Sequence, residues 1–546
     1  MVDVNGVERR GANPAVWLAL GVCLALALVL RVWGIDYGVP HPTVRPDEER
    51  IVGRAHTILA TGDPSPVSYT YPGLMIYLNT LALGVYAALG QLWGRYRSLF
   101  DFLFDAAVTR PGLEYLICRV VSVILGVLTV GATFFLARDG YRSRSVGLVA
   151  ALCIATNYLH VRSSHFATVD VGMTFFVTLS LLFAVRVSSV PSWKNYLWCG
   201  FFLGAATAAK YNAALALVAL AAASVSAVSR GEASEAKASR LIPRLLVAMM
   251  VMVLVFAALS PYSLLHYRAA LNELAKVHQF LSSGNELGAW THLRVTLPDG
   301  FGWPFYLVLV AALFRALWLR RPVDLTLLAF VGAFFIHIGG LGVVYPRYMV
   351  PLAPVLSVLV AELLVSVLRA RPRYLFAAAT VVLIGPPLSQ SLRIDRLLAR
   401  EDTRLMASRW ISEHLPRREA ILVCQGYGAP VINTDRRRPP VFQPRSIPCS
   451  LSAVREAKAG YLVTHEHPRL WSSPPLRPDL ADFLEKQGER LVEYDPFQKD
   501  IQGESYYYSV DSFYLPFSGL DSVERGGPKI TIWKLLREAD QPDEAR

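Results

Sequence analysis

The sequence predicts a mainly α, polytopic helical membrane protein with a small C-terminal α/β domain. Of its 546 residues, 53% are hydrophobic and only 18% are charged, whereas soluble domains carry roughly 25% charge. The hydrophobic residues also recur in blocks of about 18 to 23, the length that crosses a hydrocarbon core of roughly 30 Å. These blocks end near residue 392, and residues 393–546 are mixed and polar.

Twelve hydrophobic blocks can be drawn in the membrane part. They cover residues 15–34, 72–94, 115–137, 146–161, 171–188, 195–209, 211–228, 245–263, 302–318, 323–344, 349–368 and 374–392. The first block follows Arg9 and Arg10 and lacks a small-residue cleavage pattern, so we interpret it as an uncleaved signal anchor. Residues 1–14 would then be a cytoplasmic N-terminus.

Basic links between the blocks indicate the orientation, because short cytoplasmic loops are rich in Lys and Arg. The strongest links contain Arg138/Arg142/Arg144, Lys194, Arg230/Lys237/Arg240/Arg244, Arg320/Arg321 and Arg369/Arg371/Arg373. These five links all lie on one side of the membrane only if one of the hydrophobic blocks before Arg138 does not cross it. The block at 72–94 is the weakest, since it opens with Tyr-Pro-Gly and contains Asn79 and Gln91. We expect it to be a re-entrant or interfacial helix, which leaves eleven crossings; a full crossing is the alternative.

This orientation places one set of loops outside the cytoplasm. The set comprises residues 35–114, 161–170, 264–301, 345–348 and everything after 392. We therefore expect a multi-pass protein of the plasma (inner) membrane with an extracytoplasmic domain at 393–546. In that compartment Cys424 and Cys449 could form a disulfide, although the sequence alone leaves them equally able to stay free.

The first outer loop contains an acidic run at Asp47 and Glu48. Pro46 precedes them, and Pro at a helix start followed by acidic residues in the first turn is typical of a helix N-terminus. We expect both carboxylates at the head of a short helix at the membrane surface. They could simply complement the helix dipole.

Further ionisable residues are predicted at the same membrane surface. They are Arg119, Arg162, His165, Asp170, Lys210 and Arg347. Each cation alone could snorkel to the interface, and Asp170 could form a structural ion pair with Arg162. Several cations and carboxylates together suit displacement of a phosphate from a sugar. A carboxylate would deprotonate the incoming acceptor, and Arg and Lys would stabilise the departing phosphate.

At these residues the chain resembles the GT-C fold of polyprenyl-phosphate-dependent glycosyltransferases, including the protein O-mannosyltransferase and aminoarabinose transferase branches. The matching stretches, in order across about residues 15–370, are Arg31-Val32-Trp33, Pro46-Asp47-Glu48, Tyr71-Pro72-Gly73, Arg119-Val120-Val121-Ser122, Ser164-His165-Phe166-Ala167-Thr168-Val169-Asp170, Ala209-Lys210-Tyr211-Asn212 and Pro346-Arg347-Tyr348-Met349-Val350-Pro351. No inserted sugar-binding domain is evident; the loop at 264–301 is too short and would be an acceptor-side helix or a lid.

The resemblance implies a role for each site residue. Asp47 would be the general base, Glu48 a neighbouring acceptor-positioning or metal-binding group, and Asp170 the second acidic residue. Lys210, with Arg119 or Arg347, would bind the donor phosphate. Further substrate contacts are expected from His165, Arg162 and Tyr345. The reaction would invert the anomeric carbon, and a divalent metal such as Mg or Mn is left open.

The expected partners are a polyprenyl-phosphate sugar donor, membrane lipids and an acceptor that could be a protein, a lipid or a glycan. The net charge of +12 does not indicate nucleic acid, because the basic residues lie in the links between blocks. Two alternatives remain: a transporter or flippase of lipid-linked saccharides, and a non-catalytic scaffold. A transporter would carry ionisable groups near mid-membrane and repeated halves, and neither is evident.

The C-terminal domain is predicted from alternating strand and helix patterns. We expect helices at 400–414 and 479–487 and strands at 420–423, 460–464 and 529–535. Residues 435–438 and the Pro-rich run near Pro439 should be loops. The run Tyr506-Tyr507-Tyr508 would form either a carbohydrate-binding or a packing surface.

Overall fold

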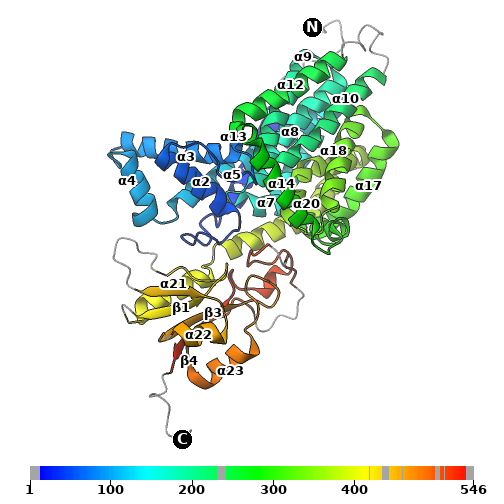
Figure 1. Cartoon of the computed structure of the whole chain (residues 1–546). Helices are drawn as coiled ribbons and strands as arrows, with labels where there is room; N and C mark the ends of the chain where they lie inside the picture. The colour runs from blue at the N-terminus through cyan, green and yellow to red at the C-terminus, as the bar shows by residue number, and fades with distance from the viewer. Residues whose placement is uncertain are drawn as a thin grey trace.

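The computed structural model describes residues 13–229, 241–416, 419–432, 442–457, 459–498, 505–508 and 511–536. They form a helical membrane domain and a C-terminal α/β domain packed against one end of it (Figure 1). The basic link through Arg230, Lys237 and Arg240 and the loop expected at 435–438 and Pro439 lie outside these residues.

All twelve predicted hydrophobic blocks fall on helices of the membrane domain. Its first half contains α1 (Pro14–Val32), α2 (Glu48–Thr61), α3 (Leu74–Leu92), α4 (Leu99–Phe104), η1 (Asp105–Thr109), α5 (Leu113–Tyr141), α6 (Arg144–Thr156), α7 (Tyr158–Ser164), α8 (Val169–Ser189), α9 (Trp193–Ala209), η2 (Tyr211–Ala216) and α10 (Leu217–Ser229). Its second half contains α12 (Leu241–Leu259), α13 (Pro261–Leu265), α14 (Tyr267–Ser282), α15 (Gly288–Thr291), η3 (His292–Thr296), α16 (Leu297–Phe301), α17 (Trp303–Leu319), α18 (Pro322–Gly339), η4 (Pro346–Leu352), α19 (Ala353–Leu368) and α20 (Arg373–Leu398).

Nine helices in the described ranges are long and apolar enough to cross a membrane, or up to eleven if two bent pairs each count as one span. One pair, α6 and α7, bends by 57° at Asn157, whose side chain accepts the backbone N–H of His160 and so starts a new helix. The other pair bends by 119° between α16 and α17. Helices α2, α3 and α4 project to one side of the bundle (Figure 1), and whether α3 crosses stays a prediction.

The C-terminal domain is a five-stranded mixed sheet with helices. Its elements are α21 (Thr403–His414), β1 (Ala420–Cys424), β2 (Gln443–Ile447), α22 (Leu451–Ala457), β3 (Tyr461–Glu466), α23 (Pro478–Gln487), β4 (Gly488–Tyr494), η5 (Leu520–Ser522) and β5 (Lys529–Leu535). The strand order is β2-β1-β3-β5-β4. Strand β1 is parallel to β2 and β3, whereas β5 is antiparallel to β3 and β4. The predicted helices and strands are all present, and β2 and β4 were not predicted.

Two open questions about this domain are settled by the structure. Cys424 and Cys449 form a disulfide, which ties the end of β1 to the residues that follow β2. Tyr507 and Tyr508 are buried, and Tyr508 packs against Phe517. These tyrosines are therefore packing residues, and the alternative of a carbohydrate-binding surface is not supported.

Candidate active site

Asp47 lies immediately before α2, as the N-cap residue. The helix begins at Glu48, slightly later than the predicted start at Pro46, because Asp47 adopts a left-handed backbone conformation with φ 74°. Its carboxylate is 22% exposed and accepts a hydrogen bond of 2.7 Å from Nη2 of Arg347. The Nε of Arg50 lies 3.9 Å from the same carboxylate. The predicted base is thus held in place and still reachable.

Arg347 connects Asp47 to two further carboxylates. It lies on η4, between α18 and α19, and its guanidinium stands 4.6 Å from the ring centre of Tyr345. Its Nη1 is 3.3 Å from Oδ1 of Asp511, and its Nε is 3.9 Å from Oδ2 of Asp170. One buried guanidinium therefore holds three carboxylates around a common centre.

Asp170 pairs with Lys210, so the alternative of a structural ion pair between Asp170 and Arg162 is not realised. Lys210 ends α9, and its Nζ donates to Oδ1 of Asp170 at 2.7 Å. The same Nζ lies 4.3 Å from the ring centre of Tyr348. The guanidinium of Arg162 instead donates to the backbone carbonyls of Leu515 and Pro516.

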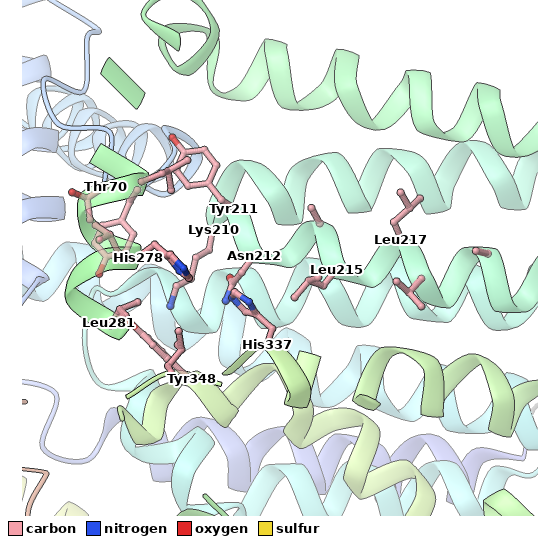
Figure 2. A pocket seen from close by; sticks show the side chains of 17 residues that line it. Thr70, Lys210, Tyr211, Asn212, Leu215, Leu217, His278, Leu281, His337 and Tyr348 are labelled. Atoms are coloured by element: carbon pink, nitrogen blue, oxygen red, sulfur yellow. The ribbon is translucent and has the colours of Figure 1, made fainter. Parts of the chain in front are cut away.

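Lys210 also lies at the polar end of a cavity of about 680 Å³. At this end the cavity is lined by Lys210, Asn212, His278, His337 and Tyr348, which Figure 2 shows close to one another. From there it runs along η2 and α10, where its lining is apolar. The apolar residues of that wall are Ala214, Leu215, Leu217, Val218 and Ala221. A cavity with one cationic, polar end and a long apolar wall suits a lipid whose head carries phosphate.

Helix α14, inside the predicted lid loop 264–301, supplies another wall of this cavity. Leu274, Val277, His278 and Leu281 all face it. The same helix contacts the loop between α2 and α3 through Glu273, whose Oε2 accepts hydrogen bonds from Ser68 Oγ and the Tyr69 backbone N–H. Helix α14 is therefore part of the cavity wall, and its role as an acceptor-side helix or as a lid stays a prediction.

Glu48 and Arg119 form a buried ion pair away from this cavity. Both side chains are 1% exposed, and the Nε and Nη2 of Arg119 donate to the two carboxylate oxygens at 2.7 Å each. The Nη1 of Arg119 donates to the backbone carbonyls of Ile35 and Tyr37. This geometry favours a structural role over the expected phosphate contact of Arg119 and over the expected acceptor or metal contact of Glu48.

The side chains of His165 and Arg162 are likewise hydrogen-bonded inside the protein. The two ring nitrogens of His165 lie 2.9 Å from the carbonyl of Val161 and 3.0 Å from that of Trp33. The Nη1 of Arg162 also donates to the hydroxyl of Tyr158 at 2.7 Å. Of the three expected substrate contacts, only Tyr345 lies beside the central guanidinium.

Sequence reasoning missed Arg45 and Asp511. Arg45 donates to Oδ1 of Asp511 at 2.9 Å and stands 4.8 Å from the ring centre of Phe513. Arg45 adjoins the predicted Pro46-Asp47-Glu48 motif, so its position in the loop was a usable signal. Asp511 lies in the C-terminal domain, and nothing in its neighbourhood in the sequence marks it.

The surrounding cations control the charge of Asp47. Burial alone raises the pKa of this carboxyl, but the nearby cations, Arg347 first and then Arg50, Arg45 and Lys210, together outweigh burial and leave the pKa below its ordinary value. Asp47 is therefore ionised at neutral pH, as a base must be. Within the described residues, no group of three or more His, Cys, Asp or Glu side chains is arranged to hold a metal ion.

Comparison with known proteins defines the class to which this fold belongs. The chain has the GT-C fold: it aligns with ArnT from Cupriavidus metallidurans bound to undecaprenyl phosphate over 98% of this chain and all of that one, with a TM-score of 0.54 and 14% identity. The archaeal oligosaccharyltransferase AglB from Archaeoglobus fulgidus, in complex with an inhibitory peptide and a dolichol-phosphate, aligns over 88% of this chain and 73% of that one, with a TM-score of 0.52 and 12% identity.

The sequence match to a known family lies within the membrane domain. Residues 112–264 match the family model of the dolichyl-phosphate-mannose-protein mannosyltransferases. Dolichyl-phosphate-mannose-protein mannosyltransferase 1 of Saccharomyces cerevisiae is 26% identical over 136 residues, which is 24% of this chain and 16% of the yeast protein. The matched range contains Asp170 and Lys210. Together the comparisons show the GT-C fold across most of the chain and, over residues 112–264, a match to a family of mannosyltransferases.

Proposed function

We propose that this protein transfers a sugar from a polyprenyl-phosphate donor to an acceptor at the extracytoplasmic membrane surface, with inversion at the anomeric carbon. The observation that carries the proposal is the cavity of about 680 Å³ whose polar end holds Lys210 and whose wall along α10 is apolar. Its polar end adjoins the cluster of Asp47, Asp170 and Arg347. The ArnT and AglB structures contain undecaprenyl phosphate and dolichol-phosphate respectively, which supports the same class of donor here.

In this proposal the lipid chain lies against the apolar wall, and the phosphate approaches Lys210. A Lys ammonium neutralises the charge that grows on the phosphate as it leaves. Arg347 supplies a second cationic group near the proposed phosphate position, because its Nε lies 3.9 Å from Asp170, which pairs with Lys210. Arg119 is left out of the donor site because its guanidinium already donates to the buried Glu48 carboxylate and to two backbone carbonyls.

Asp47 is the proposed general base. The acceptor oxygen or nitrogen attacks the anomeric carbon, and its proton passes to the Asp47 carboxylate. The bond between the anomeric carbon and the phosphate oxygen breaks, and the phosphate keeps the electron pair. Attack from the side opposite the phosphate inverts the anomeric carbon. Tyr345 lies beside Arg347 and is the proposed substrate contact on this side.

The decisive experiment incubates the purified protein with a panel of polyprenyl-phosphate sugars and candidate acceptors, and measures release of polyprenyl phosphate. Asp47→Asn should reduce turnover by about a hundredfold or more, in the range of a lost general base. Asp63→Asn is the matched control, because Asp63 belongs to the same outer loop but is 59% exposed and pairs with Arg54. Full turnover in Asp47→Asn would overturn the assignment of the base.

The same assay addresses the metal and the acceptor. We propose to run it with Mg²⁺, with Mn²⁺ and with a chelator, and an activity lost on chelation and restored by one ion would establish a metal requirement. Protein, lipid and glycan acceptors are supplied in parallel. The acceptor class is then the one that accumulates sugar.

A flippase of lipid-linked saccharides is the second candidate, because the apolar cavity would also hold such a lipid. It predicts movement of a labelled donor between the leaflets of a vesicle without release of polyprenyl phosphate. A transferase releases polyprenyl phosphate and requires Asp47. The two measurements, made on one preparation, separate the candidates.

A further inference from the structure

A cluster of arginines lies at the end of the bundle opposite the candidate active site. An open pocket of about 410 Å³ is lined by Arg138, Asp139, Arg142, Arg144 and Arg186. Its residues come from the end of α5, the start of α6 and the end of α8. Helix α8 carries Asp170 in its first turn and Arg186 in its last, so the two sites are about 24 Å apart along a helix that rises 1.5 Å per residue. The pocket therefore lies at the other membrane surface.

Two of the arginines are held in place by one carboxylate, that of Asp139. Asp139 accepts hydrogen bonds from Nε of Arg138 at 2.7 Å and from Nη2 of Arg186 at 2.6 Å. Of the lining residues, Arg138, Arg142 and Arg186 together with Asp139 carry a net of two positive charges around a concave space. Arg142 is exposed at the rim. Such a set binds phosphate well, because guanidinium groups donate two parallel hydrogen bonds to its oxygens.

Aromatic rings lie directly beside the same arginines. The guanidinium of Arg138 stands 4.7 Å from the ring centre of Phe135, and Trp17, 46% exposed, packs against that phenylalanine. The guanidinium of Arg186 stands 4.8 Å from the ring centre of Phe183, which stacks on Trp198. Exposed tryptophans mark the level of lipid headgroups. The pocket is thus bordered by a surface suited to acyl chains rather than by a water-facing domain.

We propose that this pocket binds the phosphate headgroup of an anionic phospholipid, with the acyl chains lying along the neighbouring aromatic surface. Basic pockets between membrane helices suit such headgroups. A soluble phosphate would satisfy the arginines but would leave the aromatic border unused. The proposal concerns the surface opposite Asp47 and does not depend on the proposed transferase activity.

The test measures retention of phosphatidylglycerol and of zwitterionic phosphatidylcholine by the purified full-length protein, using native mass spectrometry. Arg142→Gln should weaken phosphatidylglycerol binding about fivefold, the effect of one cation near an anionic lipid, and leave phosphatidylcholine unchanged. Arg320→Gln is a matched control: like Arg142, Arg320 is exposed and ends a helix in a left-handed conformation, with φ 49° against 50°. It does not line the pocket.

Arg142→Lys keeps the charge and should retain binding, which separates loss of binding from damage to the fold. Equal losses in Arg142→Gln and Arg320→Gln, or no preference for phosphatidylglycerol over phosphatidylcholine, would overturn the proposal. So would displacement of the lipid by an equal concentration of inorganic phosphate, since that outcome assigns the pocket to a soluble anion.

Discussion

Arg347 stands between Asp47, Asp170 and Asp511 and thereby sets the charge state of the proposed base. Burial would raise the pKa of Asp47, and the guanidinium 2.7 Å away lowers it again. Its position on η4, beside Asp511 of the C-terminal domain, also couples the base to both parts of the chain. Single side chains in this cluster therefore affect chemistry and stability separately, and two substitutions distinguish these effects.

Arg347→Gln should move the acidic limb of the pH profile of kcat/KM to higher pH. Asp47 acts only when ionised, and without the guanidinium its burial raises its pKa, so activity is lost at a less acidic pH. Arg50→Gln is the control, because Arg50 lies farther from Asp47, at 3.9 Å, and is 55% exposed. The acidic limb of the Arg50→Gln profile should therefore move less. An unchanged limb in Arg347→Gln would contradict the proposed coupling.

Glu48→Gln should destabilise the protein, whereas Asp47→Asn should not. The change leaves Arg119 buried beside an uncharged partner, and breaking a buried ion pair costs about 3 to 5 kcal/mol. Thermal unfolding in detergent would show a lower midpoint for Glu48→Gln alone. A normal midpoint together with lost turnover would instead assign Glu48 to the chemistry.

At the scale of elements, the break between α9 and α10 helps to form the cavity that we propose for the donor. Lys210 ends α9 in an extended conformation, and the chain restarts as the 3₁₀ turn η2 before α10. The break lets Lys210 reach Asp170 on α8, while the apolar side of η2 and α10 continues as the cavity wall. Lys210 at the polar end and the apolar wall along η2 and α10 are thus consecutive in the sequence.

Ala221→Trp should close the apolar part of the cavity without disturbing Lys210. Ala221 lines the wall, and a donor that loses contact with several methylene groups loses about 0.8 kcal/mol for each one. The KM for long-chain donors should rise tenfold or more, and that for short-chain donors should change little. Val253→Trp on α12 places the same ring at a 57% exposed position and serves as the control. Equal effects on long and short donors would contradict the cavity as the lipid site.

For the whole molecule, the candidate active site is completed where the two domains meet. Arg45, in the loop between α1 and α2, binds Asp511, and Arg162 binds the carbonyls of Leu515 and Pro516. His41 of the same loop lies 2.8 Å from the carbonyl of Ala429. The C-terminal domain therefore holds the loop that carries Asp47.

The interface should weaken as the pH falls from about 6.5 to about 4. Burial, aided by Arg404, lowers the pKa of His41 from 6.5 to about 4. Between these values the unfolded chain binds a proton that the folded chain does not, so about 3 kcal/mol of stability is lost as the solution is acidified. His41→Gln should flatten the dependence of the unfolding midpoint on pH across this range. An identical slope in both proteins would show that other groups control it.

Much of the element structure could be predicted because it depends on local pattern. The twelve hydrophobic blocks and strand β1 are apolar runs, and β3 and β5 are short segments rich in apolar and β-branched residues; both patterns are visible without knowing the neighbouring elements. Strand β2 contains Pro444 and is largely exposed, and β4 follows α23 without a loop and carries charged residues. Strand β2 forms by pairing with β1, and β4 by pairing with β5; no local sequence pattern predicts such pairing.

The sequence by itself determined the membrane class, the twelve hydrophobic blocks and the residues Asp47, Asp170, Lys210 and Arg347, because hydrophobic length and charges beside apolar runs are local properties. Only the tertiary structure decided how the charges pair. It assigned Lys210 to Asp170 and buried Arg119 with Glu48. It also brought Asp511 to Arg45, 466 positions away in the chain. An ion pair requires only that two groups lie close in space, and the separation of two residues in the sequence does not predict whether they do.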